Sequence, residues 1–391
     1  MITDLFAGPR GWSEGLKPLN LRDIGLEWDT SACKTAAAAG HLTIQTDVAQ
    51  YPTAPFEDRC RGLIASPPCQ AWSKAGKGDG LKDQPLVHQA VEDAAHGRDT
   101  RAELKAACKD ERSILAAEPM RWLHNLRPEW TCMEEVPDVL PLWRQYALYL
   151  RGWGYSVWTG ILNAADYGVP QTRRRAILIA SRTRNVTAPE PTHAADPAHD
   201  LFGDCLPGWV SMADALGWTD GITVNTRGER KTAGGNDFSA DGPSWCLTEK
   251  TRSWVLKSRR DSDTWIASNG PRENRRGDQP APTFTGEAHR WSWALERPAT
   301  TVCSTNRIAP PGHRDRSAGG ESHFASPDTI RVTVEEAAVL QSFRPDYPWQ
   351  GSRTAQFLQV GNAVPPLLAA HIVSAATGIP MPATQPALNA A

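Results

Sequence analysis

The sequence predicts an α/β fold in which a doubly wound, mostly parallel sheet carries a second, smaller, mostly β or irregular module. In the N-terminal half, short apolar runs such as Ile2–Phe6 and Arg61–Ala65 end in polar or glycine-containing turns, which is typical of buried parallel strands. From about residue 182 to about residue 325 the chain is instead rich in Gly, Pro, Ser, Thr, Trp and Arg. The expected units are therefore 1–182, 183–325, a return segment 326–378, and a Pro/Ala-rich tail 379–391 that we expect to be disordered.

Composition and cysteine usage narrow the class of protein. The 391 residues are 40% hydrophobic, which is enough for a real core, and the net charge is −2. The eight cysteines show no CxxC pair and no metal-ligand spacing, which predicts a reducing compartment and no structural zinc. The N-terminus lacks a basic region followed by an apolar one, and no window approaches 18 consecutive apolar residues. We therefore expect a cytoplasmic protein that does not contact a membrane.

The segment 64–73 reads Ile-Ala-Ser-Pro-Pro-Cys-Gln-Ala-Trp-Ser and places a cysteine just after a short apolar strand. Each proline restricts its own φ and the conformation of the residue before it, so Cys69 is expected on a stiff backbone. A thiol reacts as the thiolate, so a nucleophilic Cys69 needs an acid or base from elsewhere in the chain. The alternative is a small, buried and inert cysteine. The Gly- and Lys-rich segment 74–80 is flexible enough to act as a lid.

Three other strand ends carry groups that suit a ligand with a ribose and an adenine. Glycines in segment 7–16 allow a ligand to approach the backbone closely before a helix begins, although such turns are common. Glu27 after the second strand can accept hydrogen bonds from ribose hydroxyls, and Trp28 can stack on adenine. Asp47 follows the third strand-like run and suits an adenine amino group. The alternative for each acid is a solvated loop end.

The strand at 130–135 ends in a pair of glutamates. Burial and a like-charged neighbour raise the pKa of a carboxyl group, which would suit Glu134 to donate a proton near neutral pH. A solvated acidic turn is the alternative. Farther along, Arg173 and Arg175 alternate in an extended segment, so they are expected on one face, where two guanidiniums suit an anionic or oxygen-rich ligand.

The remaining elements are predicted from local patterns. Residues 84–112 are polar and helix-prone without a clear apolar stripe, which indicates a surface insertion, and residues 113–126 form a better helix that Pro128 ends. A capping box from Thr333 to Glu336 predicts the start of a helix, and residues 367–376 predict an apolar one.

The segment 225–316 is locally basic, with 16 Lys and Arg against 11 Asp and Glu. It repeats an acid, a proline two residues later and a β-prone ending at 241–248, 278–285 and 296–303, which predicts an irregular, mostly β module. A basic module suits contact with phosphates. Its tryptophans are most simply explained as a small core.

Six blocks occur in a particular order: Asp-Leu-Phe-Ala-Gly (4–8), Pro-Pro-Cys-Gln (67–70), Glu-Glu-Val-Pro (134–137), Gln-Thr-Arg-Arg-Arg (171–175), Thr-Val-Glu-Glu-Ala (333–337) and Gly-Asn-Ala-Val-Pro-Pro (361–366). Together they resemble the DNA cytosine-5 methyltransferase family over nearly the whole chain. The resemblance implies a Rossmann-like, S-adenosylmethionine-dependent methyltransferase sheet. It also implies that residues 183–325 form a target recognition domain, which grips phosphates and reads the major groove of a specific double-stranded DNA sequence.

The resemblance further implies residue roles. Cys69 would add to C6 of a cytosine flipped out of the duplex, Glu134 would protonate N3, and Arg173 and Arg175 would hold the cysteine loop and the O2 side of the base. The implied cofactor pocket comprises Phe6, Gly8, Gly11, Glu27, Trp28, Asp47, Pro68, Asn362 and Val364. Contacts to DNA or within the cysteine loop would come from Gln70, Ser73 and Gln171. The resemblance implies no metal.

Two positions depart from the family pattern. Arg10 stands where glycine is usual, and Glu135 stands where asparagine is usual. A DNA-binding protein of this fold with lapsed catalysis is therefore one alternative. An RNA cytosine-5 methyltransferase is another, although the transfer-RNA relative of the family lacks a large recognition domain.

We expect a monomer of bacterial or phage origin, associated with the nucleoid through DNA, with a cognate restriction endonuclease as a candidate partner.

Overall fold

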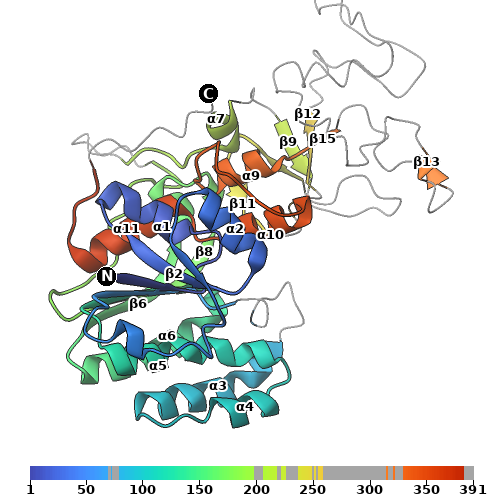
Figure 1. Cartoon of the computed structure of the whole chain (residues 1–391). Helices are drawn as coiled ribbons and strands as arrows, with labels where there is room; N and C mark the ends of the chain where they lie inside the picture. Colours follow the sequence, from blue (N-terminus) through green and yellow to red (C-terminus); the bar gives the residue numbers. More distant parts are fainter. Residues whose placement is uncertain are drawn as a thin grey trace, which may run out of the picture.

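The computed structural model describes residues 1–68, 72, 79–197, 206–217, 222–225, 237–248, 251, 254–258, 314–315, 320–321 and 329–382, and the structural statements below concern these residues. Figure 1 shows a layered α/β body with a smaller module beside it. Disorder is expected for the tail 379–391, of which residues 383–391 lie outside the described part. For its first residues the expectation is wrong, because Ile379 and Met381 pack against the hydrophobic core.

A central sheet of seven strands has the order β3-β2-β1-β4-β5-β8-β6. Its strands are β1 (Ile2–Leu5), β2 (Asp23–Glu27), β3 (Thr43–Gln45), β4 (Gly62–Ala65), β5 (Trp130–Glu135), β6 (Ser156–Asn163) and β8 (Arg174–Ser181). The five strands from β3 to β5 run parallel, and β8 is antiparallel to both of its neighbours. The parallel strands are short and apolar because both faces of the sheet are covered by helices. The predicted α/β class with a mostly parallel sheet is confirmed.

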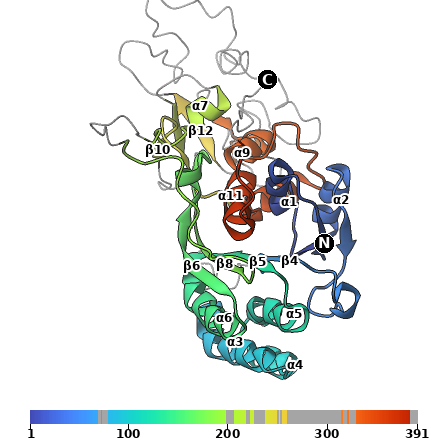
Figure 2. The same cartoon turned by 90° about the vertical axis from the view of Figure 1, so that its left-hand side faces the viewer.

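Helices cover the two faces of this sheet as separate layers (Figure 2). Successive strand residues point to opposite faces, so Ile64 and Cys132 join one core cluster while Leu63 and Met133 join the other. The first cluster is covered by α1 (Gly11–Leu16) and α11 (Pro366–Thr377), and the second by α3 (Asp79–Ala95), α5 (Glu118–Leu126) and α6 (Leu140–Gly152). The helix α2 (Thr30–Ala38) connects β2 to β3.

The prediction of a surface insertion at residues 84–112 is wrong for its first half. Helix α3 buries Val87, Ala90, Val91 and Ala94 in the core, whereas α4 (Arg101–Ala107) buries none of its residues. The stripe on α3 has helical spacing but consists of small side chains, so it does not stand out among polar neighbours. The predicted helix 113–126 is also shorter than expected, because residues Glu111–Ala117 form a 3-10 helix and α5 begins at Glu118, directly before Pro119.

The smaller module is built on a four-stranded sheet of order β10-β9-β12-β15. Its described elements are α7 (Met212–Leu216), β9 (Ile222–Asn225), β10 (Asp237–Ser239), β11 (Ser244–Trp245), β12 (Val255–Ser258), β13 (Arg314–Asp315), β14 (Gly320–Glu321) and β15 (Thr329–Arg331). Its core contains Val224, Leu247 and Trp254, as expected for a tryptophan in a small core, whereas Trp245 is 40% exposed. The first predicted repeat, 241–248, contains β11, and the repeats at 278–285 and 296–303 lie outside the described residues.

The smaller module is joined to the layers of the central sheet through a short strand pairing. The strand β11 pairs in parallel with β7 (Gln171–Thr172), which directly precedes the arginines of β8. After β15 the chain enters α9 (Val334–Leu340), where Thr333 and Glu336 form the predicted capping box. The helix α10 (Arg353–Asn362) follows. Its side chains Phe357 and Val360 belong to the same hydrophobic cluster as Val224 of the module.

The last helix returns to the beginning of the chain. A Cβ atom added to Gly11 would lie 2.1 Å from the carbonyl oxygen of Val364, and Val364 and Leu368 pack in one cluster with Ile2 of β1. This return segment therefore packs against α1 and joins the core cluster that includes β1. The stretch Arg353–Thr377 is long and apolar enough to cross a membrane, but 78% of its most apolar window is buried inside the protein, as expected of core helices.

Candidate active site

Five parallel strands end on the same edge of the central sheet. The register pairs Leu5 of β1 with Leu26 of β2 and with Ala65 of β4, and it pairs Ala65 with Met133 of β5. Residues that follow these strand ends therefore lie side by side along the edge, which is where ligands bind in open α/β sheets. The predicted positions that this edge brings together are Phe6, Gly8, Glu27, Trp28, Asp47, Pro68 and Glu134.

Glu134 meets both predicted arginines at this edge. It pairs in register with Ile177 of β8, and Arg175 and Arg173 precede Ile177 at alternate positions, so the three side chains share one face. Nε of Arg175 lies 2.9 Å and Nη2 of Arg173 lies 3.8 Å from Oε1 of Glu134. The side chains of Glu134 and Arg173 are only 6% and 2% exposed, so solvent screens this attraction little. The predicted common face of the arginines is confirmed.

Arg173 also connects blocks that are distant in the sequence. Its Nη1 donates a hydrogen bond to the carbonyl oxygen of Gly361 at 2.8 Å, so the arginine block contacts the end of α10. Asn362 is exposed next to this contact. The structure thus brings the Gly361-Asn362 segment to the same region as Glu134.

Glu135 occupies the opposite face from Glu134. It is 1% exposed and accepts a hydrogen bond from the backbone N–H of Val136. Burial raises the pKa of Glu135 well above its ordinary value, and the neighbouring Glu134 raises it further. Strand alternation therefore keeps the Glu135 carboxyl group away from Arg173 and Arg175, which face Glu134.

The predicted nucleophile segment is described up to Pro68. Ser66 directly follows β4, and its hydroxyl accepts a hydrogen bond of 2.9 Å from the indole N–H of Trp12 on α1. This contact fixes the backbone that leads into Pro67 and Pro68. Cys69, Gln70 and Ser73, together with the proposed lid up to Gly78, lie outside the described residues.

Cys246 in the smaller module lies beside the two arginines, a position that the sequence did not indicate. Its Sγ lies 3.5 Å from Nη2 of Arg175 and 3.7 Å from Nη1 of Arg173. Burial raises the pKa of the thiol, but the charges of Arg175 and Arg173 outweigh burial, so the pKa lies below its ordinary value. No local pattern in the sequence singles out Cys246, because its contacts depend on the pairing of β11 with β7.

Gln171 lies in the interior. Its side chain is fully buried, accepts a hydrogen bond of 3.0 Å from the backbone N–H of Leu247, and donates to Oε1 of Gln341 at the end of α9. The resemblance implies that Gln171 contacts DNA or the cysteine loop. Its burial argues against a direct contact with DNA, whereas the cysteine loop lies outside the described residues. Within the described residues, Gln171 bridges the smaller module to the return segment.

In the loop after β1, every second residue from Phe6 to Arg10 has a left-handed backbone conformation. Phe6, Gly8 and Arg10 have φ values of 60°, 51° and 77°. For a residue other than glycine this region costs roughly 1–2 kcal/mol, so contacts must hold the loop. One of them is a hydrogen bond of 2.8 Å from the backbone N–H of Gly8 to Oε2 of Glu27.

Glu27 is held by backbone donors at the end of β2. Its Oε1 accepts hydrogen bonds from the N–H groups of Trp28 and Asp29 at 2.9 Å and 2.7 Å. Burial raises the pKa of Glu27, and these N–H groups counteract part of that effect. The carboxylate therefore has a fixed direction, and the neighbouring indole of Trp28 is 76% exposed.

The other predicted pocket residues show where a ligand has room. A Cβ atom added to Gly8 would meet nothing within 4 Å, whereas one added to Gly11 would collide with Val364. Gly11 therefore serves close packing, and the space lies over Gly8. Asp47 is half-buried, and its oxygens accept hydrogen bonds from Ala49 and Gln50 within its own loop. An open backbone, a fixed carboxylate and an exposed indole fit a ligand with ribose hydroxyls and an aromatic base.

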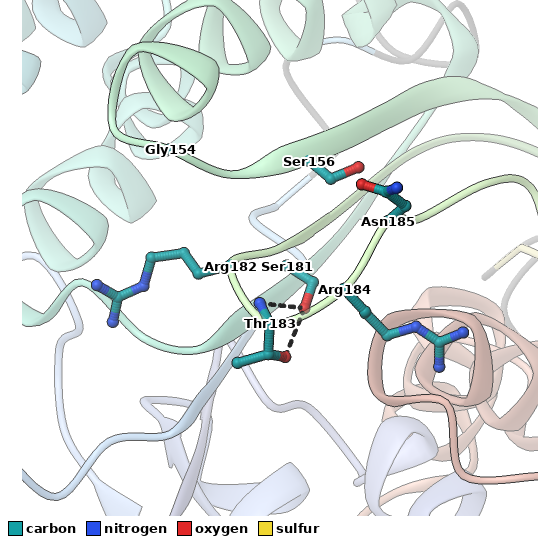
Figure 3. Close-up of a pocket in the computed structure, with 7 residues that line it drawn as sticks. All are labelled: Gly154, Ser156, Ser181, Arg182, Thr183, Arg184 and Asn185. Atoms are coloured by element: carbon teal, nitrogen blue, oxygen red, sulfur yellow. Dashed lines mark hydrogen bonds between the residues drawn. The ribbon is translucent and has the colours of Figure 1, made fainter.

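A separate pocket of about 330 Å³ lies at the other end of the sheet. Its lining includes Ser181, which pairs with Trp130 at the start of β5, far from the edge that carries Glu134. Figure 3 shows the side chains of Arg182 and Arg184 pointing in opposite directions. Nε of Arg182 already donates to the carbonyl oxygen of Pro128. The two arginines of this pocket therefore do not converge on a common ligand.

Comparison with known proteins agrees with this arrangement. A family model of the C-5 cytosine-specific DNA methylase matches residues 1–92 and 101–377. The type II methyltransferase M1.HphI of Haemophilus parahaemolyticus is 25% identical over 95% of this chain and 85% of its own length. M.DdeI of Desulfomicrobium norvegicum is 25% identical over 94% of this chain and 86% of its own.

The structure has a solved neighbour of the same fold. The Dnmt2 methyltransferase of S. pombe superposes with a TM-score of 0.55, covers 96% of this chain and 98% of its own, and is 13% identical. With the family model matching nearly the whole sequence, the chain belongs to the C-5 cytosine-specific DNA methylase family.

Proposed function

We propose that this DNA cytosine-5 methyltransferase transfers a methyl group from S-adenosylmethionine to C5 of cytosine within a specific double-stranded DNA sequence. The observation that carries the proposal is the contact of Glu134 with Arg175 and Arg173 at the carboxyl edge of the sheet. The neighbouring strand at this edge leads into Pro67, Pro68 and Cys69. Glu134 thus lies on the strand next to the one whose end leads into Cys69, and both arginines lie beside Glu134.

The proposed chemistry begins at the base. C5 of cytosine is a poor nucleophile, and a thiolate of Cys69 that forms a bond to C6 shifts electron density toward C5 while N3 accepts a proton from Glu134. S-adenosylmethionine supplies the electrophilic methyl group when bound. As C5 gains the methyl carbon, the bond from that carbon to the sulfonium sulfur breaks and S-adenosylhomocysteine is the leaving group. Loss of the C5 proton to a base, return of the N3 proton to Glu134 and departure of the Cys69 thiolate then restore the aromatic ring.

Arg175 and Arg173 have distinct proposed tasks. Nε of Arg175 lies close to Glu134, so its guanidinium is placed to bind the O2 side of a cytosine whose N3 faces the carboxyl group. Arg173 is held by Gly361 and is placed to support the segment that carries Cys69. Arginine suits both tasks because its planar group keeps its charge and donates several hydrogen bonds in fixed directions.

The loop after β1 and the end of β2 would hold the methyl donor. Glu27 would bind the ribose hydroxyls, Trp28 would stack on adenine, and Asp47 would bind its amino group. Phe6, Gly8, Gly11, Pro68, Asn362 and Val364 would complete the pocket. The open space over Gly8 supports this assignment.

The substrate cytosine would leave the duplex, because its C5 and C6 atoms cannot be reached inside the helix. We assign the expected recognition unit, residues 183–325, to target recognition, and residues 1–182 with the return segment to catalysis. The expected boundary at residue 325 is too early, because β15 (Thr329–Arg331) pairs with β12 in the small sheet, so the return segment begins after Arg331. A monomer in the cytoplasm of a bacterium, acting beside a cognate restriction endonuclease, fits the type II relatives, and Gln70 and Ser73 remain candidate DNA or loop contacts.

Two experiments test the proposal. Bisulfite sequencing of DNA from cells that express the chain should show methylated cytosines in one sequence context. The purified protein should form a covalent complex with duplex DNA that contains 5-fluorocytosine in that context, because the C5 fluorine cannot leave as a proton does. Trapping on transfer RNA but not on DNA would favour the RNA alternative, and duplex binding without trapping would favour lapsed catalysis.

A further inference from the structure

Arg10, where the family usually has glycine, directs its side chain into the protein. The residue is fully buried, and its Nη2 lies 2.9 Å from Oδ2 of Asp23, whose side chain is 3% exposed. The same oxygen accepts a hydrogen bond of 2.9 Å from the hydroxyl of Ser13 on α1. A buried guanidinium requires such a partner, because an unpaired charge is strongly unfavourable in the interior.

A glycine on β2 provides the space for this guanidinium. A Cβ atom added to Gly25 would lie 1.2 Å from Nη1 of Arg10. Gly25 pairs in register with Asp4 of β1, and Asp23 lies two positions earlier on β2, so the guanidinium covers a patch of the sheet with an acid on either side. Burial raises the pKa of Asp4 well above its ordinary value, and Arg10 counteracts part of that effect. Arg10 and Gly25 are thus matched residues.

The backbone of Arg10 closes the loop that precedes α1. Its φ of 77° lies in the left-handed region, which glycine adopts freely and arginine does not. Its N–H donates to the carbonyl oxygen of Ala7 at 3.0 Å, and Gly8 between them donates to Glu27. An attraction between the side chain and β2 therefore fixes the loop that carries Gly8.

We propose that Arg10 is a positioning residue for the methyl-donor loop, residues 6–11. Its buried ion pair with Asp23, in the space over Gly25, holds the left-handed backbone conformation at position 10 that a glycine would adopt without such a contact. This inference rests on the proposed function, because it takes residues 6–11 as part of the cofactor pocket. A glycine at position 10 would then weaken cofactor binding in this chain. The space over Gly25 would be empty, and the buried carboxyl group of Asp23 would have no guanidinium beside it.

The test compares the full-length protein with three variants and a control. Calorimetry gives the Kd for S-adenosylhomocysteine, and a separate titration gives the Kd for duplex DNA, each well below the unfolding temperature of the variant. We expect Arg10→Gly and Asp23→Asn to bind S-adenosylhomocysteine roughly tenfold more weakly, or about 1.4 kcal/mol, with unchanged DNA affinity. Arg10→Lys keeps a cation and should recover part of the loss. Arg22→Ala removes an exposed neighbouring charge and should bind like the wild type.

A split in steady-state constants provides a second measurement. KM for S-adenosylmethionine should rise in Arg10→Gly, while kcat at saturating donor stays near the wild-type value, because the reacting groups at Glu134 are untouched. Asp23→Asn keeps the side-chain volume and decides the question if Arg10→Gly does not fold. Unchanged Kd values in a folded variant, or equal losses for S-adenosylhomocysteine and DNA, would overturn the inference. Failure of the wild type to bind S-adenosylhomocysteine would instead overturn the proposed function.

Discussion

Glu134 and Glu135 are adjacent on β5, but their carboxyl groups lie on opposite faces of the sheet and in different electrostatic surroundings. Glu134 lies 2.9 Å from Nε of Arg175. Glu135 is buried against the backbone of Val136, and burial raises its pKa well above the ordinary value. The division of roles between the two acids follows from strand alternation, since one face of β5 meets the arginines and the other does not.

Glu134→Gln should lower the rate of methyl transfer by about 10² to 10⁴-fold, the range that a general acid contributes. The amide keeps the shape of the side chain but cannot donate the proton to N3, so duplex affinity should be retained. Single-turnover methyl transfer on unmethylated and hemimethylated duplex measures the effect. A variant with a wild-type rate would show that the proton comes from another group.

Glu135→Asn should leave methyl transfer intact or slightly faster and should change how stability depends on pH. The folded-state pKa of Glu135 lies above the ordinary value of 4.5, so its contribution to stability is fully present below pH 4.5 and is lost as the pH rises through the folded pKa. The variant lacks this titration. Between pH 4.5 and the folded-state pKa of Glu135, the unfolding free energy of the wild type should therefore fall relative to that of the variant. The difference should grow by up to about 1.4 kcal/mol per pH unit.

Urea unfolding at a series of pH values from 4 to 9 measures this difference, with the exposed Glu190→Gln as the matched control that should show none. A constant difference across the series would mean that Glu135 titrates normally. If Glu135→Asn slowed methyl transfer as much as Glu134→Gln, the two carboxyl groups would have to act as a unit.

Cys69→Ser should abolish methyl transfer while leaving duplex binding largely intact, because affinity for DNA comes mainly from phosphate contacts. Filter binding and trapping on 5-fluorocytosine DNA separate the two properties. Cys132→Ala is the control, since Cys132 is fully buried in the core on β5 and should not be needed for trapping. Joint loss of binding and transfer in a folded Cys69→Ser protein would contradict the proposed division of labour between the units.

Cys246→Ala should slow methyl transfer by up to about tenfold and should still allow trapping on 5-fluorocytosine DNA. The thiol contacts Arg175 and Arg173, and its loss would leave these guanidiniums less firmly placed beside Glu134. Cys246→Ser retains a polar group of similar size and should recover most of the rate. Equal rates for the alanine variant and the wild type would show that the thiol contacts have no role in the reaction.

Much of the secondary structure, and the face on which several side chains lie, could be predicted from local patterns in the sequence. Apolar runs with breakers predicted the strands, alternation placed Arg173 and Arg175 on one face, and a Thr–Glu spacing predicted the cap of α9. These features depend on near neighbours in the chain, so they can be predicted from a single sequence. The order of the six blocks was specific enough to indicate the family, which the comparison then confirmed.

Contacts between distant residues were decided by the tertiary structure alone. Cys246 reaches the arginines because β11 pairs with β7, and Arg10 is accommodated because residue 25, on the neighbouring strand, is a glycine. The stripe on α3 became a core face because α5, α6 and the 3-10 helix Glu111–Ala117 pack against α3. The sequence by itself determined which side chains could do the chemistry and on which element each would lie. The topology decided which of them meet, because strand order and register set distances between residues that no local pattern encodes.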